Sequence, residues 1–513
     1  VLVASGVTLT IEAGVVINFS DDYKLLVKGN ITSSGTSGSL ITFNGNSSEG
    51  SNQMIIFKST NLSNSTITYN VFNGPQKAIQ LGDEAEHNQD STKNSGILTV
   101  TYSDFNNAGL YTKGYSTSAE LKFENSTFDD LTIKGYYPRT EPITFTNCTI
   151  KNSEIFSDSY NYGIKFYSSL ITDSSFKIGC CGSNFIIDNT IVYNSSFNQT
   201  NNYHTTTINN SFIINSFLNL SSGDINISKS IIAFSDDYTK SGLQSNSEGI
   251  YARSAVISNS GFYGYKFGEG LGFNTYQNYT NSITKSTFAN NDIHIVVNAT
   301  NGTFTFDENN FLNSNNTYRI YNNSSRDITA TNNYWGSSDD SEIQNLLFDS
   351  SDDVDKGTIN YSSNSSTHYL TAPISPPSNV TKFFDGDAVV LNWSANGESD
   401  VAGYKLYYGT PTGYSYVTIV DLGNVTTYTV TGGDIATEYA ITAYDSSLDG
   451  TDDMVDGNES WFSVSKEVKV TLTSSETSIS EPTNSSTLTA TLDNTSSADV
   501  VVNLTYTGTA TNA

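Results

Sequence analysis

A five-residue pattern of polar and apolar positions recurs along the first two-thirds of the chain. It begins with a polar or aromatic residue, carries a small polar residue in the third place and ends on a large apolar residue. Examples are TYNVF ending at Phe72, ENSTF at Phe128, SKSII at Ile232 and TNNYW at Trp335. Successive copies lie 19 to 33 residues apart, and most of them 21 to 24. The pattern is therefore a structural repeat.

A repeat of this length built from strand-forming residues predicts one coil of a parallel β-helix, with three short strands joined by turns. It is too short for a propeller blade or a two-helix repeat, and the Leu-x-x-Leu-x-Leu frame of leucine-rich repeats is missing. Successive coils would stack at about 4.8 Å, the usual spacing of paired strands. We therefore predict an all-β protein that begins with a right-handed parallel β-helix of about 12 or more coils.

The chemistry of the repeat assigns a role to each place. The fifth place would form an apolar column inside the coils. The third place would form a ladder of small polar side chains that hydrogen-bond one coil to the next. Cys148 stands in the third place, where a small buried residue fits. The third-place residues are Asn70, Ser103, Ser126, Cys148, Ser169, Thr190, Ser211, Ser230, Ser260, Ser286, Asn309 and Asn333.

The three longest gaps in the repeat predict loops that bulge from single coils. They contain 82–95, 241–253 and the glycine- and aromatic-rich run 261–279. Solenoid proteins often place insertions on one binding face, so these loops are candidate contact surfaces. Neutral surface decoration is the alternative.

Both ends of the repeat region resemble secreted right-handed parallel β-helix proteins, the pectate-lyase-like repeat superfamily. The opening match contains Gly6-Val7-Thr8-Leu9-Thr10-Ile11 and Ile41-Thr42-Phe43, and the closing match contains Asn332-Asn333-Tyr334-Trp335-Gly336. The resemblance covers about 1–372 and implies the fold more than an activity, because this fold hosts many functions. A short helix is expected at about 340–348, with acidic residues in its first turn.

A second module follows a short stiff linker at 373–377, which contains Pro373, Pro376 and Pro377. Residues 376–467 resemble a fibronectin type III domain. The resemblance rests on AVVLNWSA with Trp393, on SDVAGYKLYYGT with Tyr404 and Tyr407, and on EYAITAYDSSLDG with Tyr439 and Tyr444. Alternating apolar and polar residues in these strands are typical of a sandwich.

The last segment, 468–513, resembles the first half of a Calx-β domain. Ser480-Glu481-Pro482 precedes the alternating strand TLTATL in this segment. Half of a sandwich cannot close its core, so the sequence predicts that the chain is a fragment, or that this segment pairs with something beyond it.

The charge balance limits the partners. The chain has 52 acidic and 24 basic residues, a formal charge of −28 at pH 7. This charge disfavours nucleic acids and anionic membrane surfaces, and it favours divalent cations or neutral glycans. A solvated acidic surface is the plain alternative.

The remaining composition favours an extracellular location, either secreted or attached to the cell surface. Cys148, Cys180 and Cys181 are an odd set with two neighbours, which is a poor disulfide framework. No run of about 18 apolar residues predicts a membrane span. The chain begins at Val1 with no leader, as expected of a mature segment of a longer protein or a larger surface assembly.

The sequence offers no clear catalytic constellation. A polysaccharide lyase needs a cationic base beside Ca²⁺-binding carboxylates, and Arg139, Arg253, Arg319 and Arg326 are the only arginines. A hydrolase needs carboxylates paired across coils. The four histidines, His87, His204, His294 and His368, lack zinc-ligand spacing. We therefore predict a protein that is not an enzyme.

The strongest chemical signal is the acidic loop DSSLDGTDDMVDGNES in the second module. Ca²⁺ takes six to eight oxygen ligands from flexible turns that contain glycine, so calcium is the candidate cofactor. A solvated acidic loop is the alternative, and a second cluster of Asp349, Asp352, Asp353 and Asp355 favours that alternative. The candidate ligands are Asp445, Asp449, Asp452, Asp453, Asp456 and Glu459.

These observations favour a non-enzymatic, adhesin-like surface protein of bacterial type. Its rigid β-helix would present loops for adhesion, with glycans or matrix polymers as partners. One alternative is a polysaccharide lyase or hydrolase on the same fold. The other is a subunit of an extracellular filament or of an assembly associated with secretion or motility.

Overall fold

The computed structural model describes most of the chain. The described residues are 1–20, 23–45, 53–74, 77–82, 94–113, 118–136, 142–158, 163–178, 184–199, 205–234, 250–265, 269–273, 278–314, 318–410, 415–478 and 485–493. They form two compact units. Unit 1 contains Val1–Pro373 and Asp452–Gly457, and unit 2 contains Ile374–Thr451 and Asn458–Ala513.

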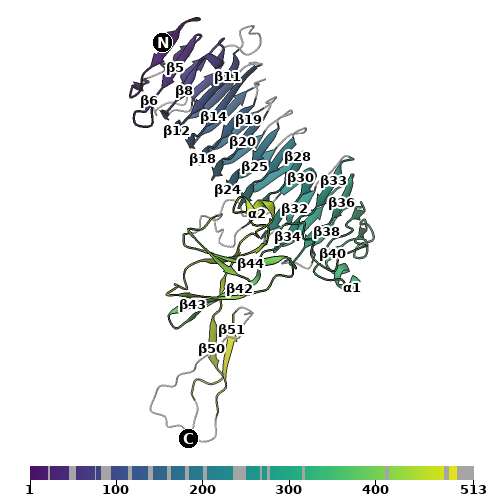
Figure 1. Cartoon of the computed structure of the whole chain (residues 1–513). Coiled ribbons are helices and arrows are strands. Elements are labelled where there is room, and N and C mark those ends of the chain that lie inside the picture. Colours follow the sequence, from purple (N-terminus) through teal and green to yellow (C-terminus); the bar gives the residue numbers. More distant parts are fainter. Residues whose placement is uncertain are drawn as a thin grey trace. The chain divides into compact units, whose positions relative to one another are not determined.

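Unit 1 is a parallel β-solenoid of the right-handed type, as predicted (Figure 1), and it has about 11 turns where the sequence predicted about 12 or more. Each coil contributes strands to three sheets, which we number by the order of their first strands. A representative coil contains β14 (Ser118–Glu124) in sheet 2, β15 (Thr127–Asp129) in sheet 3 and β16 (Thr132–Tyr136) in sheet 1. Each strand pairs in parallel with its equivalent one coil later.

The strands of sheet 1 follow the coils from the N-terminus. They are β1 (Leu2–Val3), β4 (Leu25–Val27), β7 (Gln53–Phe57), β10 (Lys77–Leu81), β13 (Gly109–Lys113), β16, β19 (Glu154–Asp158), β22 (Ser175–Ile178), β25 (Ser196–Gln199), β28 (Phe217–Ser228), β30 (Ile250–Ser258), β32 (Glu269–Phe273), β35 (Ile293–Val297), β38 (Ile320–Asn322) and β40 (Leu347–Phe348).

Sheets 2 and 3 are built in the same way. The strands of sheet 2 are β2 (Thr8–Ile11), β5 (Asn30–Ser34), β8 (Thr66–Thr68), β11 (Ser95–Thr101), β14, β17 (Ile143–Thr146), β20 (Ile164–Tyr167), β23 (Phe185–Asp188), β26 (Thr205–Asn209), β28, β30, β33 (Thr280–Thr284), β36 (Thr303–Asp307), β39 (Ile328–Thr329) and β41 (Ile359–Asn360). The strands of sheet 3 are β3 (Val16–Asn18), β6 (Ile41–Asn44), β9 (Asn70–Asn73), β12 (Asp104–Asn106), β15, β18 (Thr149–Lys151), β21 (Leu170–Thr172), β24 (Ile191–Tyr193), β27 (Phe212–Ile214), β29 (Ile231–Ala233), β31 (Gly261–Tyr263), β34 (Thr287–Ala289) and β37 (Asn310–Phe311). A short 3-10 helix, η1 (Leu62–Asn64), precedes β8.

The interior of the solenoid is the predicted apolar column. Phe72, Phe105 and Phe128 stack with ring centroids 4.7 and 4.8 Å apart, the spacing of the coils themselves. The column ends with Trp335 on Phe311 at 4.8 Å. All of these side chains are 0% exposed, so each coil buries its ring against the next.

The predicted polar ladder is confirmed, and the structure shows which atoms make it. At ten of the eleven steps of the ladder, the backbone N–H of a third-place residue donates to the side chain of the third-place residue one coil later. Examples are Thr190 N to Ser211 Oγ at 3.1 Å and Ser211 N to Ser230 Oγ at 3.2 Å. The ladder therefore satisfies buried N–H groups that turn away from the sheets at a corner.

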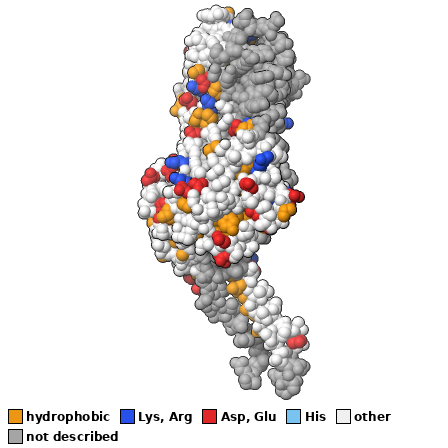
Figure 2. Space-filling model, turned by 90° about the vertical axis from the view of Figure 1, so that its right-hand side faces the viewer, with side chains coloured by type: hydrophobic (Ala, Val, Ile, Leu, Met, Phe, Trp, Pro, Cys, Tyr) orange, Lys and Arg blue, Asp and Glu red, His pale blue; other side chains and the backbone are white. Residues whose placement is uncertain are grey.

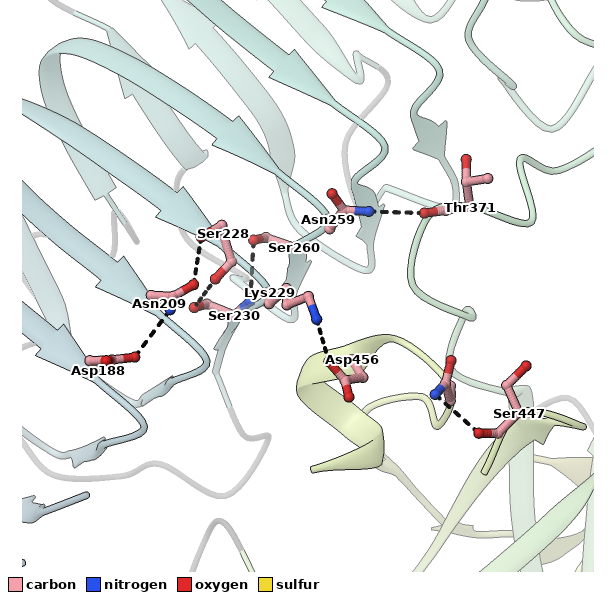
Figure 3. Close-up of polar contacts among 11 residues, drawn as sticks. Asp188, Asn209, Ser228, Lys229, Ser230, Asn259, Ser260, Thr371, Ser447 and Asp456 are labelled. Atoms are coloured by element: carbon pink, nitrogen blue, oxygen red, sulfur yellow. Dashed lines mark hydrogen bonds and ion pairs between the residues drawn. The ribbon is translucent and has the colours of Figure 1, made fainter. Parts of the chain in front are cut away.

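A left-handed backbone conformation forms this corner in coil after coil. The residue before each ladder position has a positive φ, for example 50° at Asn125, 49° at Asn189 and 47° at Asn210. Asparagine tolerates this conformation better than most residues. Outward-facing side chains near the corner also bond across coils, as Asn209 does with Asp188 at 3.1 Å and with Ser228 at 2.7 Å (Figure 3).

A second corner repeats the device five residues later, between sheets 3 and 1. Asn152 and Asn194 have positive φ there, and Ser153 N donates to Ser174 Oγ at 3.1 Å. Ser174 N in turn donates to Ser195 Oγ at 3.0 Å. This ladder was missed from the sequence because only one five-residue pattern per coil was aligned.

The end of unit 1 differs in detail from the prediction. Helix α1 spans Asp340–Gln344 with Asp339 as its N-cap, and it ends before the predicted residue 348 because Leu347 pairs with Ile320 in sheet 1. Residues after the last coil then return along sheet 3. Tyr369 O accepts a bond from Asn310 Nδ2 at 3.1 Å, and Thr371 O accepts one from Asn259 at 3.2 Å (Figure 3).

The predicted loops are described only in part. Most of 82–95 and of 241–253 lies outside the described residues. The prediction that 261–279 is one loop was wrong, because Gly261–Tyr263 and Glu269–Phe273 are strands of two sheets. Phe262 and Leu271, one from each strand, are 0% exposed, so both strands contribute to the core.

Unit 2 contains two four-stranded sheets in the orders β46-β43-β42-β49 and β45-β44-β47-β48. Between them Trp393 and Tyr404 pack at 5.5 Å in a core that also holds Ile374. The strands are β42 (Ser378–Asp385), β43 (Ala388–Ser394), β44 (Val401–Tyr408), β45 (Thr418–Gly423), β46 (Thr427–Thr431), β47 (Tyr439–Asp445), β48 (Ser463–Val464) and β49 (Lys466–Glu467).

The predicted linker is packed. Ile374 is 4% exposed, and Ser375 N donates to Glu398 Oε1 at 2.9 Å. The Pro-rich stretch therefore begins the core of unit 2 and is not a free spacer.

The last described element is a hairpin of β50 (Val470–Ser474) and β51 (Leu488–Leu492). Its pairs Val470–Leu492 and Leu472–Ala490 share one face, and four threonines occupy the other. Leu472 is 48% exposed and Leu488 45% exposed, so the apolar face has no cover among the described residues.

The ladder makes a direct stability prediction for Ser211→Ala. The variant leaves the buried N–H of Thr190 without its acceptor, and we expect a loss of about 1–3 kcal/mol. Thr207→Ala, on the outward side of the same coil, should change stability by less than about 0.5 kcal/mol. Urea unfolding and hydrogen exchange at the Thr190 amide measure both effects; equal losses in the two variants would contradict the ladder.

Candidate functional site

The six acidic residues proposed for calcium do not act alike in the structure. The carboxylates of Asp445 and Asp449 are exposed or half-exposed and accept the backbone N–H groups of Ser447 at 2.7 Å and Thr451 at 2.8 Å. These are local turn contacts of a type common for aspartate, and they occupy one oxygen of each carboxylate.

Three further candidates lie in or directly before a short helix, α2 (Asp453–Asp456). The segment that contains them belongs to unit 1. Asp452 precedes it with a positive φ of 52° and makes no side-chain cap. Asp456 forms an ion pair with Lys229 at 2.9 Å (Figure 3). The pair is largely exposed, so its contribution to stability is small.

Glu459 has a different role, which the sequence analysis did not predict. Its side chain is buried inside unit 2 and accepts bonds from Lys405 Nζ at 2.5 Å, from the Tyr407 hydroxyl at 2.5 Å and from Thr442 Oγ1 at 2.7 Å. Three donors and one compensating charge meet this carboxylate, which is the condition for a tolerable buried charge. Glu459 is therefore a structural anchor of the sheet β45-β44-β47-β48.

Across the part of the chain that the structure describes, no three His, Cys, Asp or Glu side chains gather so that they could hold a metal ion. In the second acidic cluster, Asp349 is 4% exposed and accepts the N–H groups of Ile359 and Ser351, both at 2.9 Å. Asp349 thus fixes a turn. Calcium at the loop of unit 2 stays a prediction, without a preformed ligand set to support it.

The described histidines have structural surroundings. His294 is buried in the solenoid, where Nε2 lies 2.9 Å from Leu312 O and Nδ1 lies 3.1 Å from Asn291 Nδ2. Burial lowers the pKa of His294 to about 3, so the ring is neutral, donates from Nε2 and accepts at Nδ1. His368 packs on Tyr334 with ring centroids 4.1 Å apart. His87 and His204 lie outside the described residues.

The side chains of the described arginines are also engaged in contacts within the protein. Arg253 pairs with Asp224 at 3.0 Å and lies over the ring of Tyr279. Arg319 is buried and donates to Phe311 O at 2.9 Å, and burial lowers its pKa to about 10. Arg326 donates to Thr300 O at 2.9 Å. Arg139 lies outside the described residues.

One face of the described surface is mostly uncharged and polar. Figure 2 shows one face on which backbone and uncharged polar side chains predominate, with acidic and basic groups interspersed. On sheet 3, an exposed ladder of asparagines is joined by hydrogen bonds of 2.9 to 3.0 Å between side-chain amides. Its members are Asn18, Asn44, Asn73 and Asn106. Beside it, Tyr69 and Tyr102 stack at 4.9 Å on a corner. The sequence analysis missed these columns because it followed only inward-facing places.

The thiol of Cys148 is buried in the third-place ladder and lies 3.4 Å from Phe123 O. Burial raises the pKa of Cys148 to about 11, which leaves the thiol unreactive near neutral pH. This agrees with the structural role expected from its place in the repeat. Cys180 and Cys181 lie outside the described residues.

Comparison with known proteins yields no family. No family model matches the chain, and no curated protein matches it. Among solved structures, the Dettilon tailspike protein is similar over 85% of this chain and 86% of its own, at 9% identity and a TM-score of 0.23. A tailspike protein of the E. coli bacteriophage HK620, in complex with a pentasaccharide, matches over 86% and 84%, at 10% identity and a TM-score of 0.27.

A third match is to the Clostridium perfringens spore cortex lytic enzyme SleM. It covers 18% of this chain and only 29% of that enzyme, at 17% identity and a TM-score of 0.14. Similarities at these levels assign no activity to the chain. The class that the fold itself defines is a parallel β-solenoid with additional β-sheets toward its C-terminal end. Among the described residues, none of the helices has the length and apolar character needed to cross a membrane.

The buried contacts of Glu459 predict how its substitution changes the stability of unit 2. Glu459→Gln removes the charge that compensates Lys405 in a buried network, and we expect unit 2 to lose about 3 kcal/mol of stability. Asp449→Asn, in the same acidic segment, should cost less than about 1 kcal/mol because that carboxylate is solvated. Thermal unfolding followed by near-ultraviolet circular dichroism compares the two; a larger effect at Asp449 would refute the assignment.

The burial of His294 predicts that the free energy of unfolding depends on pH. The folded-state pKa of about 3 lies below the ordinary 6.5, so below pH 6.5 the unfolded chain binds a proton that the folded chain does not. The stabilising contribution is complete above pH 6.5 and is lost as the pH falls toward 3, at about 1.4 kcal/mol per pH unit. Between pH 7 and 5 the wild type should lose about 2 kcal/mol more than His294→Gln in urea unfolding. Parallel pH profiles would disprove this origin.

Proposed function

We propose that the chain is part of a non-enzymatic extracellular surface protein, adhesin-like, whose β-solenoid presents a neutral polar surface to glycans or to polymers of a cell surface or matrix. The observation that supports this most directly is the pattern of exposed columns. The solenoid repeats Asn, Thr and Tyr side chains at the spacing of the coils.

Rigidity supports the same proposal. Two buried ladders and stacked interior rings join each coil to the next, so the exposed side chains are held at fixed separations. A preordered surface loses little conformational entropy when it binds, and repeated identical groups suit a polymeric ligand with repeated units.

We also propose that unit 2 is a fibronectin type III-like spacer. Tyr439, at the start of β47, donates its hydroxyl to Asp434 O at 3.2 Å. A tyrosine that bonds back to the backbone just upstream of a late strand is a hallmark of sandwiches of the immunoglobulin type. Trp393 in the core of the two sheets agrees with the same class.

One alternative has a specific observation in its favour. The hairpin β50–β51 exposes Leu472, Leu488 and Leu492 on one face. A two-stranded sheet of this kind is marginal alone and is stabilised by further strands. This favours the proposal of a larger surface assembly, either through more of the same polypeptide, as in a Calx-β module, or through other subunits.

A glycan array combined with an assay for released reducing sugars tests the proposed function. We expect retention on at least one class of neutral oligosaccharide, no release of reducing ends over hours, and the same result with and without a calcium chelator. Steady release of sugar products would refute the non-enzymatic role and favour a glycoside hydrolase or lyase. Absence of retention on all glycans would refute the glycan contact.

A further inference from the structure

Two tyrosines lie at a corner of the solenoid where the backbone is left-handed in every repeat and where asparagine is the commonest residue. Tyr69 and Tyr102 occupy the corner position that precedes the third-place ladder, and their φ angles are 53° and 49°. Most other coils place residues such as Asn125, Asn147 and Asn189 there. A bulky residue in the left-handed region costs on the order of 1–3 kcal/mol and is a reason to search for a function.

The two rings stack on one another at the surface as a pair, called the platform, in which Tyr102 is exposed and Tyr69 is half-buried. Their centroids are 4.9 Å apart and their planes are inclined by 9°. Tyr102 is 50% exposed, so its ring lies at the surface and does not turn toward the core. The fold does not require the rings, because asparagine forms the same corner in the coils that follow.

The neighbours of the platform leave its outer ring faces uncovered by other aromatic rings. On the N-terminal side, Gly35 lies against the backbone of Tyr69, since a Cβ on Gly35 would be 2.4 Å from Tyr69 O. On the C-terminal side, Asn125 is in register with Tyr102, because Tyr102 N bonds to Glu124 O at 3.0 Å. Both neighbouring positions therefore carry short side chains or none.

Hydrogen-bonding groups stand next to the platform. Thr68 and Thr101 precede the two tyrosines and their hydroxyls bond to each other at 2.8 Å. Asn125 follows in the next coil, where it accepts a bond from Asn147. An aromatic face beside hydroxyl and amide groups has the two elements that bind a pyranose ring, whose C–H face is apolar and whose edge is polar.

We propose that Tyr69 and Tyr102 form a binding subsite that stacks against a sugar ring of an uncharged glycan. This inference rests on the proposed function and names its site and ligand class. Asp104 lies on the same coil as Tyr102 and Glu124 on the next coil, and the whole chain carries a formal charge of −28, so sulfated or uronic acid glycans are disfavoured. The negative face of each ring attracts the weakly positive C–H groups of the sugar.

The matched variants keep the backbone intact. Tyr69→Asn with Tyr102→Asn gives the corner the residue that the following coils use, so a purely structural role predicts an unchanged unfolding midpoint and unchanged binding. Tyr102→Phe keeps the ring face and loses only the hydroxyl. Tyr23→Asn removes a tyrosine that is 68% exposed elsewhere on the N-terminal coils and serves as the control.

The experiment measures binding to an array of neutral hexose and N-acetylhexosamine oligosaccharides with a matched acidic set, followed by calorimetry with the strongest neutral binder. We expect the double variant to lose at least tenfold in affinity with a urea midpoint no lower than that of the wild type, while the Phe variant and the control remain within twofold of wild-type affinity.

Each other outcome overturns the inference in a recognisable way. Wild-type binding that survives in the double variant removes this subsite and leaves the proposed function standing. Binding confined to the acidic set overturns the ligand class. A wild-type chain that binds no glycan at all refutes both the subsite and the proposed function.

Discussion

The solenoid depends on the hydrogen bond between a buried corner N–H and a side chain one coil later. Where the chain leaves one sheet for the next, its N–H turns inward, away from the strand ladder, and would be unsatisfied. Ser, Thr or Asn at the same place in most coils answers that need, as in Thr190 N to Ser211 Oγ at 3.1 Å. Because the donor and acceptor belong to different coils, the corner also locks the register of the stack.

This constraint explains why so much of the fold could be read from the sequence. A residue that must be small, polar and inward-facing, two places before a large apolar residue, leaves a periodic signal in the chain. The interior positions from Phe72 to Trp335 and the ladder from Asn70 to Asn333 were found in that way. The start of α1 was expected from acidic residues in its first turn, but its end at Gln344 depended on a strand pairing of Leu347 that no local pattern records.

The candidate site was less predictable for a physical reason. The acidic residues of unit 2 were grouped by closeness in sequence, but burial separates their roles: Glu459 turns into the sheet packing to meet Lys405, while Asp445 and Asp449 bond to their own turns. The outward platform of Tyr69 and Tyr102 arises from residues 33 positions apart, brought together by stacking. Outward-facing places tolerate many residues, so their columns carry a weak periodic signal, whereas the inward ones carry a strong one.

The corner geometry also bears on the chemical lifetime of the chain. Asn–Ser and Asn–Thr bonds age by deamidation, which begins when the backbone nitrogen after the asparagine attacks its side-chain amide. At Asn189-Thr190, Asn210-Ser211 and Asn259-Ser260 that nitrogen is already bonded to the neighbouring coil, through Ser211, Ser230 and Ser286. The ladder that sets the register thus also withholds the attacking atom, and an asparagine-rich polypeptide ages more slowly while it remains folded.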